Sequence, residues 1–142
     1  MNPQRITMVT LAVKDLEISR KFYAALGFVE ADGGNEKIAF YKMNGQFFSL
    51  YLRDALAADL CMPIHGRSTG NATMATNYDS RDAVDAAYQT ALDAGAICIT
   101  KPTEVFWGGY SGNYTDPDGH LWEIAHNPFW SFDDDGNVIG EP

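Results

Sequence analysis

Residues 106–128 read "FWGGYSGNYTDPDGHLWEIAHNP", and their pattern predicts two strands joined by a tight turn. The turn falls at residues 116–119, "DPDG", where Pro presets one backbone angle and Gly tolerates a positive φ. After the turn, "HLWEIAH" alternates, so that Trp122 and Ile124 lie on one face of the strand and Glu123 lies on the other. We expect the face with Trp122 to pack under a helix, which turns Glu123 toward the open face of a sheet.

The same arrangement occurs earlier in the chain, where "GQFFSLYL" (45–52) corresponds to "GHLWEIAH" (119–126). Each segment ends a series that begins with a strand, continues with a helix and adds three strands. Asp15 and Ser80 are the expected N-caps of the two helices. The chain therefore repeats one order of elements, β-α-β-β-β, in its two halves.

Two βαβββ modules are predicted over about residues 5–53 and 71–128, which together form a single domain of the α+β class. The linker at 54–70 is too long for a simple loop, and "DALAADL" within it predicts a short helix. The acidic tail at 129–142 is expected to be a solvated end.

The composition is that of an ordinary globular protein, with 46% hydrophobic and 20% charged residues. No run of eighteen consecutive apolar residues is present, so we expect no membrane span, and the N-terminus lacks a secretory cleavage site. The net charge of −9 argues against nucleic-acid binding, which requires clustered Lys and Arg. It favours a cationic or neutral small molecule as partner, or serves solubility alone. Cys61 and Cys98 have no CxxC partner, so we expect reduced thiols and a cytoplasmic location.

Two such modules in 142 residues resemble the vicinal-oxygen-chelate superfamily, which includes glyoxalase I, bleomycin-resistance proteins and extradiol dioxygenases. The stretch 106–128 is similar to the final hairpin of a bacterial glyoxalase-like subgroup, and "VKDLEISRKFYAALGF" (13–28) is similar to the opening helix of that family. The resemblance implies a cupped mixed sheet with helices on its outer face, and a homodimer.

In the metalloenzymes that this chain resembles, His and Glu side chains on the first and last strand of each module bind a divalent metal. The corresponding places here hold Met8, Ser49, Met74 (with Thr76 two residues on) and Glu123, so one ligand of four is retained. A metal site requires three or four converging N or O donors. We therefore expect no metal cofactor.

The neighbouring histidines do not complete a metal site with Glu123. His120 and His126 share a face of the predicted strand but lie about 20 Å apart, and Glu123 points to the opposite face. The alternative is a relocated divalent metal held by Glu123, a loop histidine such as His65, and a residue of a partner chain.

The predicted lining of the cup is apolar and aromatic with a few hydroxyl groups and one carboxylate, the usual composition of a small-molecule pocket. It comprises Met8, Thr10, Phe47, Ser49, Tyr51, Met74, Thr76 and Glu123. Glycines in "FWGGYSGNY" predict a bulge or a close approach of another part of the chain. The aromatic residues of that stretch line the mouth of the cup or a dimer contact, or else belong to the core: Trp107, Tyr110 and Tyr114.

Glu123 is the candidate catalytic residue. A carboxylate in such a pocket can pair with a cationic ligand, act as a general base, or only hydrogen-bond to nearby hydroxyl groups. One hypothesis is a metal-independent binder of a small aromatic or cationic molecule, similar to the bleomycin-resistance branch. The other is a glyoxalase-like lyase, isomerase or dioxygenase that uses a relocated metal or Glu123 as base.

Overall fold

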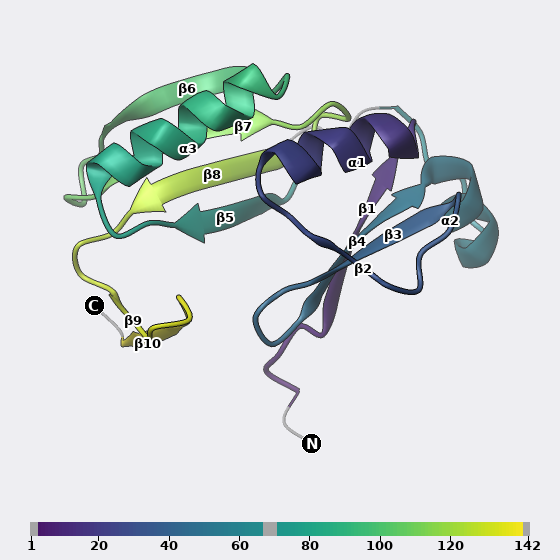
Figure 1. The fold of residues 1–142 in the computed structure, drawn as a ribbon, viewed down its shortest axis with the longest axis horizontal. Coiled ribbons are helices and arrows are strands. Elements are labelled where there is room, and N and C mark those ends of the chain that lie inside the picture. The colour runs from purple at the N-terminus through teal and green to yellow at the C-terminus, as the bar shows by residue number, and fades with distance from the viewer. Residues whose placement is uncertain (1–2, 67–70, 141–142) are drawn as a thin grey trace. The chain divides into compact units, whose positions relative to one another are not determined.

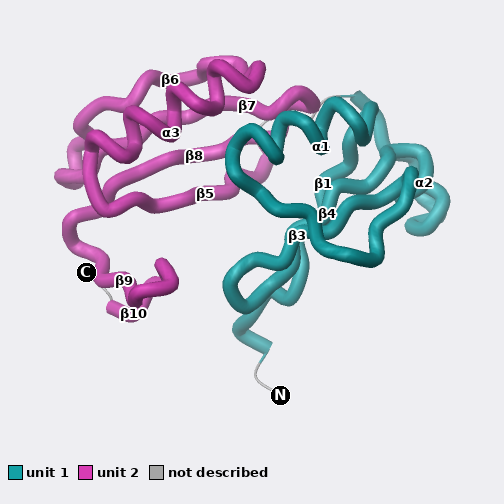
Figure 2. Tube along the Cα trace, in the orientation of Figure 1, with its two compact units in different colours: residues 1–66 teal, residues 67–142 magenta. Residues whose placement is uncertain are grey.

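The computed structural model describes residues 3–66 and 71–140. The chain divides into two compact units, Met1–Gly66 and Arg67–Pro142, which Figure 2 shows in different colours. Each unit contains its own four-stranded mixed sheet with a helix packed on one face (Figure 1). We call the opposite face of each sheet its open face.

Residues 3–66 of the first unit form four strands and two helices. Their bounds are β1 Met8–Val13, α1 Leu16–Ala25, β2 Glu30–Ala31, β3 Ile38–Lys42, β4 Phe47–Leu52 and α2 Arg53–Leu60. The strands are ordered β1-β4-β3-β2, with β1 parallel to β4 and the remaining pairs antiparallel. The parallel pair joins the first strand of the module to its last, so the elements between them form the crossover connection.

The core of the first unit lies between α1 and the sheet. The ring of Tyr23 on α1 lies 5.2 Å from that of Phe48 on β4, and Tyr41 on β3 lies 5.8 Å from Phe48. All three side chains are buried, and burial raises the pKa of Tyr41 to about 12. The helix begins where predicted, because the Ile18 N–H donates to Asp15 Oδ1 at 3.1 Å.

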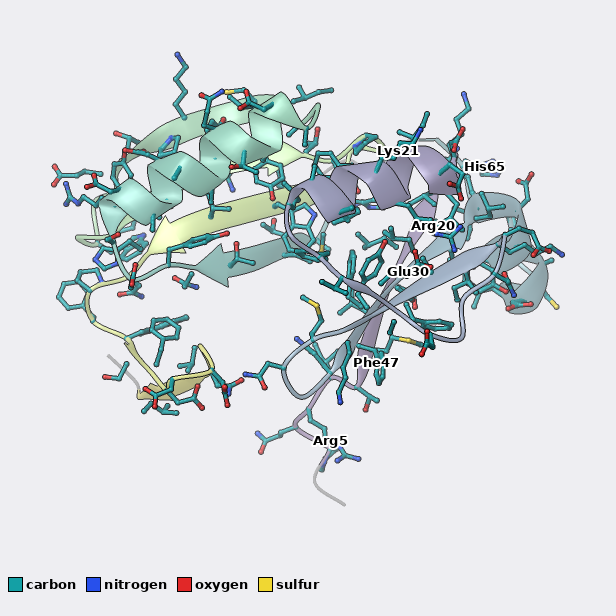
Figure 3. All side chains as sticks on the ribbon, viewed as in Figure 1. Arg5, Arg20, Lys21, Glu30, Phe47 and His65 are labelled. Atoms are coloured by element: carbon teal, nitrogen blue, oxygen red, sulfur yellow. The ribbon has the colours of Figure 1, made fainter. Side chains whose placement is uncertain are left out.

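Arg20 attaches α1 to the edge strand β2. Its guanidinium donates to both carboxylate oxygens of Glu30, with Nε–Oε2 at 3.0 Å and Nη2–Oε1 at 2.9 Å (Figure 3). The same group donates to the carbonyl oxygen of Asn35 at 2.7 Å. This two-pronged geometry is specific to Arg, and the hydrogen bonds that Arg20 donates to Glu30 raise the pKa of Arg20.

The second unit repeats the order of the first and adds a hairpin. Its elements are β5 Thr73–Asn77, α3 Arg81–Asp93, β6 Ile97–Glu104, β7 Tyr110–Thr115, β8 Leu121–His126, β9 Ser131–Phe132 and β10 Val138–Gly140. The main sheet is ordered β5-β8-β7-β6, with β5 parallel to β8. The strands β9 and β10 form a separate antiparallel pair.

The core of the second unit lies between α3 and its sheet. Ser80 caps this helix as predicted, since its hydroxyl accepts a hydrogen bond from the Ala83 N–H at 3.2 Å. Tyr88 of α3 packs edge-on against Tyr114 of β7, with ring centroids 6.2 Å apart. The buried residues of this layer are Val84, Tyr88, Ala91, Tyr114, Trp122 and Ile124.

The predicted α+β fold with two βαβββ modules is confirmed. The helix predicted in "DALAADL" is α2, which begins one residue earlier at Arg53. The tail at 129–142, for which the sequence predicted only a solvated end, contains the β9–β10 hairpin. No helix within residues 3–66 and 71–140 is both long and apolar enough to cross a membrane.

Candidate functional site

The open face of the second unit carries a pocket of about 250 Å³ beside Glu123. The pocket is formed by β5, β8, the β6–β7 turn and the segment that follows β8. Its described lining residues are Ala75, Asn77, Trp107, Glu123, Ala125, Asn127 and Trp130.

The alternation of β8 places Glu123 in this pocket. Trp122 and Ile124 are buried against the helix side, so Glu123 and Ala125 face the opposite way. Glu123 is paired in register with Ala75 on one side and with Asn113 of β7 on the other. Ala75 lines the pocket beside Glu123, and its side chain is a single methyl group.

Trp107 forms one wall of the pocket, and the glycines around it determine its position. The turn between β6 and β7 is closed by two hydrogen bonds, Gly108 N–H to Val105 O at 2.9 Å and Val105 N–H to Gly109 O at 3.0 Å. Gly108 adopts a φ of +94°, which favours glycine. A β-carbon at Gly109 would overlap the indole ring of Trp107, so the ring lies directly against this backbone. The close approach predicted from the glycines is therefore present.

Trp130 forms a second wall and was missed by the sequence analysis. It follows a turn in which the Asn127 side chain accepts a hydrogen bond from the Phe129 N–H at 3.0 Å. The β9–β10 hairpin begins at the next residue and is closed by the Asp133 N–H to Asn137 O bond at 2.9 Å. The available signal was the aromatic cluster "PFWSF" at 128–132, just before an acidic run.

The charge distribution of the chain is uneven, and Glu123 lies in the acidic part. The second unit carries three Lys and Arg against twelve Asp and Glu, whereas the first carries seven of each. Glu123 is the one ionisable residue among the described lining residues. Its carboxylate has no hydrogen-bond or salt-bridge partner within residues 3–66 and 71–140. The lining of the pocket therefore combines one carboxylate with two indole rings.

Two of the predicted lining residues, Met74 and Thr76, lie on the wrong face for this pocket. The register pairs Met74 with Trp122 and Thr76 with Ile124, which places both on the helix side. Ala75 and Asn77 occupy the open face instead. The prediction was one residue out of register, because β5 lacks a strong alternation of large and small side chains.

Tyr110 and Tyr114 also lie on the helix side, not at the mouth of the pocket. Tyr114 is buried and pairs in register with Trp122. The Tyr110 hydroxyl donates to Asp85 Oδ1 on α3 at 2.7 Å, which raises the pKa of Tyr110. Tyr114 belongs to the core, which was the alternative that the sequence left open for it.

The predicted lining residues of the first unit share one face, as the alternation requires. The register pairs Met8 with Phe47 and Thr10 with Ser49 on the open face of that sheet. The Ser49 hydroxyl donates to Thr10 Oγ1 at 2.7 Å. Tyr51, on the same face, donates to Asp59 Oδ2 at 2.6 Å, and this hydrogen bond raises its pKa.

The potential metal ligands of residues 3–66 and 71–140 are dispersed. No three His, Cys, Asp or Glu side chains among the described residues are grouped closely enough to hold an ion. The described residues that line the pocket with Glu123 carry carboxamide, methyl or indole groups, and no imidazole is among them. His126 lies on the helix side of β8, where its Nδ1 is 3.0 Å from the carbonyl oxygen of Tyr78. His65 belongs to the first unit and is exposed.

The sequence profile of the Glyoxalase/Bleomycin resistance protein/Dioxygenase superfamily matches residues 5–124. The chain belongs to this superfamily. Among solved structures it is similar to a glyoxalase-related enzyme from Fulvimarina pelagi, with 32% identity and a TM-score of 0.91 over 98% of this chain and 99% of that one. Family membership confirms the resemblance deduced from the two modules and the final hairpin.

Two other structures share the glyoxalase-superfamily fold with this chain. A lactoylglutathione lyase from Agrobacterium tumefaciens has 21% identity and a TM-score of 0.68, with 93% of this chain and 100% of that one covered. A superfamily enzyme from Burkholderia phytofirmans has 19% identity and a TM-score of 0.72, with 84% and 96% covered. An uncharacterized protein of Mycobacterium bovis is 43% identical over 42 residues, which span 30% of this chain and 28% of that relative.

Proposed function

We propose that this member of the glyoxalase superfamily binds a small organic cation in the Glu123 pocket and does so without a metal ion. The observation that carries the proposal is the Glu123 carboxylate, which has no partner among residues 3–66 and 71–140 and lines one pocket with Trp107 and Trp130. A buried or half-buried carboxylate is stabilised by an opposite charge, and a ligand cation can supply it.

The two indole rings support a cation over a neutral aromatic ligand. Indole faces attract cations through the ring quadrupole, with about 0.5–2 kcal/mol for each well-placed contact. Trp107 and Trp130 are 39% and 38% exposed, so part of each ring remains available to a ligand. Asn77 and Asn127 add amide groups that can fix the orientation of a polar substituent.

The size of the pocket limits the ligand. Drug-sized ligands occupy pockets of about 300–1,000 Å³, and this pocket measures about 250 Å³. A small amine, a quaternary ammonium ion or a guanidinium compound is therefore the expected class.

The experiment is calorimetric titration of the full chain, treated with a chelator, with tetramethylammonium, choline and guanidinium. Choline is compared with its uncharged isostere, in which carbon replaces the quaternary nitrogen. We expect at least one cation to bind and the isostere to bind much more weakly. If no cation binds, or if the isostere binds equally well, the proposal is wrong.

Glu123→Gln keeps the shape of the side chain and removes its charge, and we expect it to weaken cation binding roughly 10–100-fold. The matched control is Glu104→Gln, which removes one charge from the same unit on the helix side, where Glu104 pairs with Arg81 at 2.6 Å. Equal losses in the two variants would assign the effect to the overall field of the unit and not to the pocket.

A second candidate function is a metal-independent glyoxalase-like enzyme with Glu123 as general base. The full-length similarity to a glyoxalase-related enzyme at 32% identity favours it. A carboxylate within reach of a substrate C–H or O–H group can abstract a proton. The test is the glyoxalase reaction with chelator-treated protein, where turnover that disappears in Glu123→Gln would support this candidate. Turnover that requires an added divalent metal would instead support a relocated metal site.

The homodimer and the cytoplasmic location are proposals as well. Ile97 and Ile99 on the edge strand β6 are 49% and 55% exposed, and such an edge can pair with another chain. Light scattering of wild type and Ile99→Lys would test the dimer, since a lysine on an edge strand disfavours pairing. Cys61 and Cys98 are free and exposed, which supports a reducing compartment.

A further inference from the structure

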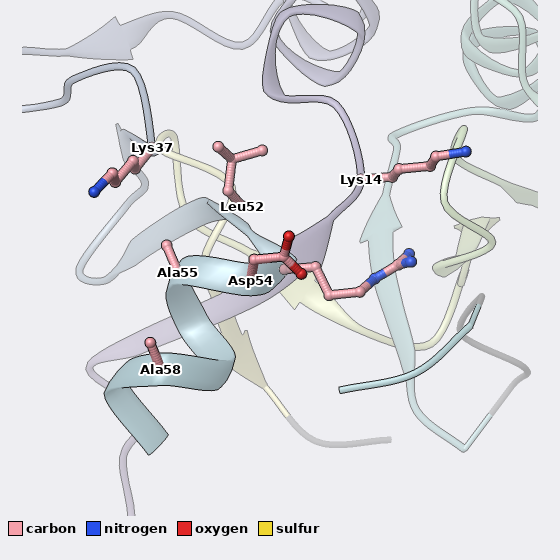
Figure 4. Close-up of a pocket in the computed structure, with 7 residues that line it drawn as sticks. Lys14, Lys37, Leu52, Asp54, Ala55 and Ala58 are labelled. Carbon is pink, nitrogen blue, oxygen red and sulfur yellow. The ribbon is translucent and has the colours of Figure 1, made fainter. Parts of the chain in front are cut away.

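The first unit carries a second pocket, which the proposed function does not use. It measures about 510 Å³ and lies over the first turn of α2, beside the ends of β1 and β4 (Figure 4). Its lining residues all belong to the first unit: Lys14, Lys37, Leu52, Arg53, Asp54, Ala55 and Ala58.

The charged residues of this pocket are mainly cationic. The lining includes three basic residues, Lys14, Lys37 and Arg53, and one carboxylate, Asp54, although the unit as a whole carries equal numbers of basic and acidic residues. In Figure 4 the ammonium groups of Lys14 and Lys37 lie on opposite sides of Asp54 and point away from it. Within the described part of the chain the Lys37 ammonium forms no salt bridge. Long lysine stems are flexible, so both ammonium groups can turn toward a bound anion.

The remaining lining supplies an apolar surface and backbone donors. Leu52, Ala55 and Ala58 present carbon atoms along one side of α2. The helix begins without a side-chain cap, and the first N–H groups of a helix have no partner within it. These groups add to the cationic side chains, because a helix N-terminus favours negative charge.

We propose that this pocket binds a small organic anion, with its carboxylate or phosphate group at Lys14, Lys37 and Arg53. The apolar part of the anion lies along Leu52, Ala55 and Ala58. The volume falls within the range of about 300–1,000 Å³ that small-molecule sites occupy. This site does not include Glu123. Its ligand is an anion, whereas the ligand proposed for the Glu123 pocket is a cation.

The test is a titration of the ¹⁵N-labelled full chain, followed by NMR at constant ionic strength. The probes are inorganic phosphate, acetate and butyrate, with chloride as the reference. We expect the amide signals of Asp54 and Ala55 to shift and to saturate. We also expect butyrate to bind more tightly than acetate, because its longer chain buries more apolar surface. Shifts that fail to saturate, or that chloride reproduces, would overturn the proposal.

Two double variants separate the site from the overall charge. Lys14→Gln/Lys37→Gln should weaken binding roughly tenfold or more, since hydrogen bonds to charged groups are lost. Lys21→Gln/Lys42→Gln removes the same charge from the same unit at lysines that do not line the pocket, and should bind as wild type. Equal weakening in both double variants would contradict the assignment.

A gain of affinity guards against a folding artefact. Asp54→Asn removes the one carboxylate of the lining and should tighten anion binding several-fold. Unfolding cannot produce that result. Unchanged or weaker binding in Asp54→Asn would count against the site.

Discussion

The indole ring of Trp107 lies against the backbone of Gly109, in the space that a β-carbon at residue 109 would fill. One wall of the Glu123 pocket therefore depends on the absence of a side chain two residues further along the chain. The shape of the candidate site therefore depends on Gly109, although Gly109 is not itself among its described lining residues.

Gly109→Ala should displace Trp107 and destabilise the fold. Insertion of a methyl group into a packed site costs about 1–3 kcal/mol. We expect a lower free energy of unfolding in urea, a change in tryptophan emission, and weaker binding of any cation that the pocket accepts.

A double-mutant cycle tests the cause of that loss. In a Trp107→Leu background the alanine has no indole ring to displace, so the same substitution should cost less. An equal cost in both backgrounds would show that the methyl group clashes with something else.

Ala75→Leu should fill the pocket from β5. Ala75 is paired in register with Glu123, so a longer side chain there occupies the space beside the carboxylate. We expect at least tenfold weaker cation binding by calorimetry, with the far-ultraviolet circular dichroism spectrum retained.

Met74→Leu is the matched control, because it changes the adjacent residue on the helix side by a volume-conserving swap that costs less than about 1.5 kcal/mol. Loss of binding in Met74→Leu and not in Ala75→Leu would support the sequence prediction that Met74, and not Ala75, lines the pocket.

Tyr110→Phe should affect stability and leave ligand binding unchanged. The Tyr110 hydroxyl donates to Asp85 at 2.7 Å on the helix side of the sheet. Loss of this solvent-exposed hydrogen bond should lower the free energy of unfolding slightly, which urea unfolding can measure. If cation affinity falls as well, Tyr110 contributes to the ligand site, contrary to its position in the structure.

The stability of the first unit should fall at alkaline pH. Burial raises the pKa of Tyr41 from its usual 10.0 to about 12, so the folded state favours the protonated phenol. The contribution is fully present below the unfolded pKa and is lost as the pH rises through the folded pKa. A difference of this size amounts to at most about 3 kcal/mol.

Tyr41→Phe removes that contribution, and its urea unfolding should depend less on pH than that of wild type between pH 10 and about 12. Identical pH profiles for the two proteins would contradict the prediction. A steeper profile for the variant would reverse its sign.

The fold could be predicted because the sequence states its order of elements twice. Strand β8 was assigned to the correct faces, since Trp122 and Ile124 are too large and apolar to leave exposed. Strand β5 was placed one residue out of register, because Met74 was matched with Met8 of the first module, and "TMATN" has no series of alternating large apolar residues to correct that match. Local pattern determines a strand, but the choice of face requires a marked contrast between alternate residues.

The candidate site was less accessible to sequence reasoning. Glu123 and Trp107 line one pocket, and Trp130 joins them only because a turn at Asn127 returns the chain toward the sheet. No spacing rule connects residues 107 and 130. Their proximity is a product of tertiary structure, which a single sequence does not encode in its local pattern.

The pairing of the first strand of each half with its last strand determines when the sheet of that half can form during synthesis. Met8 pairs with Phe47, and 38 residues separate them in the sequence. In the same way, β5 pairs with β8, which is formed much later in the chain. During synthesis, almost a whole half of the chain must therefore leave the ribosome before its first strand can pair. Contacts between residues so far apart in the sequence slow folding. In nascent chains stalled before residue 47, β1 would have no partner strand, and chaperones could bind its exposed backbone.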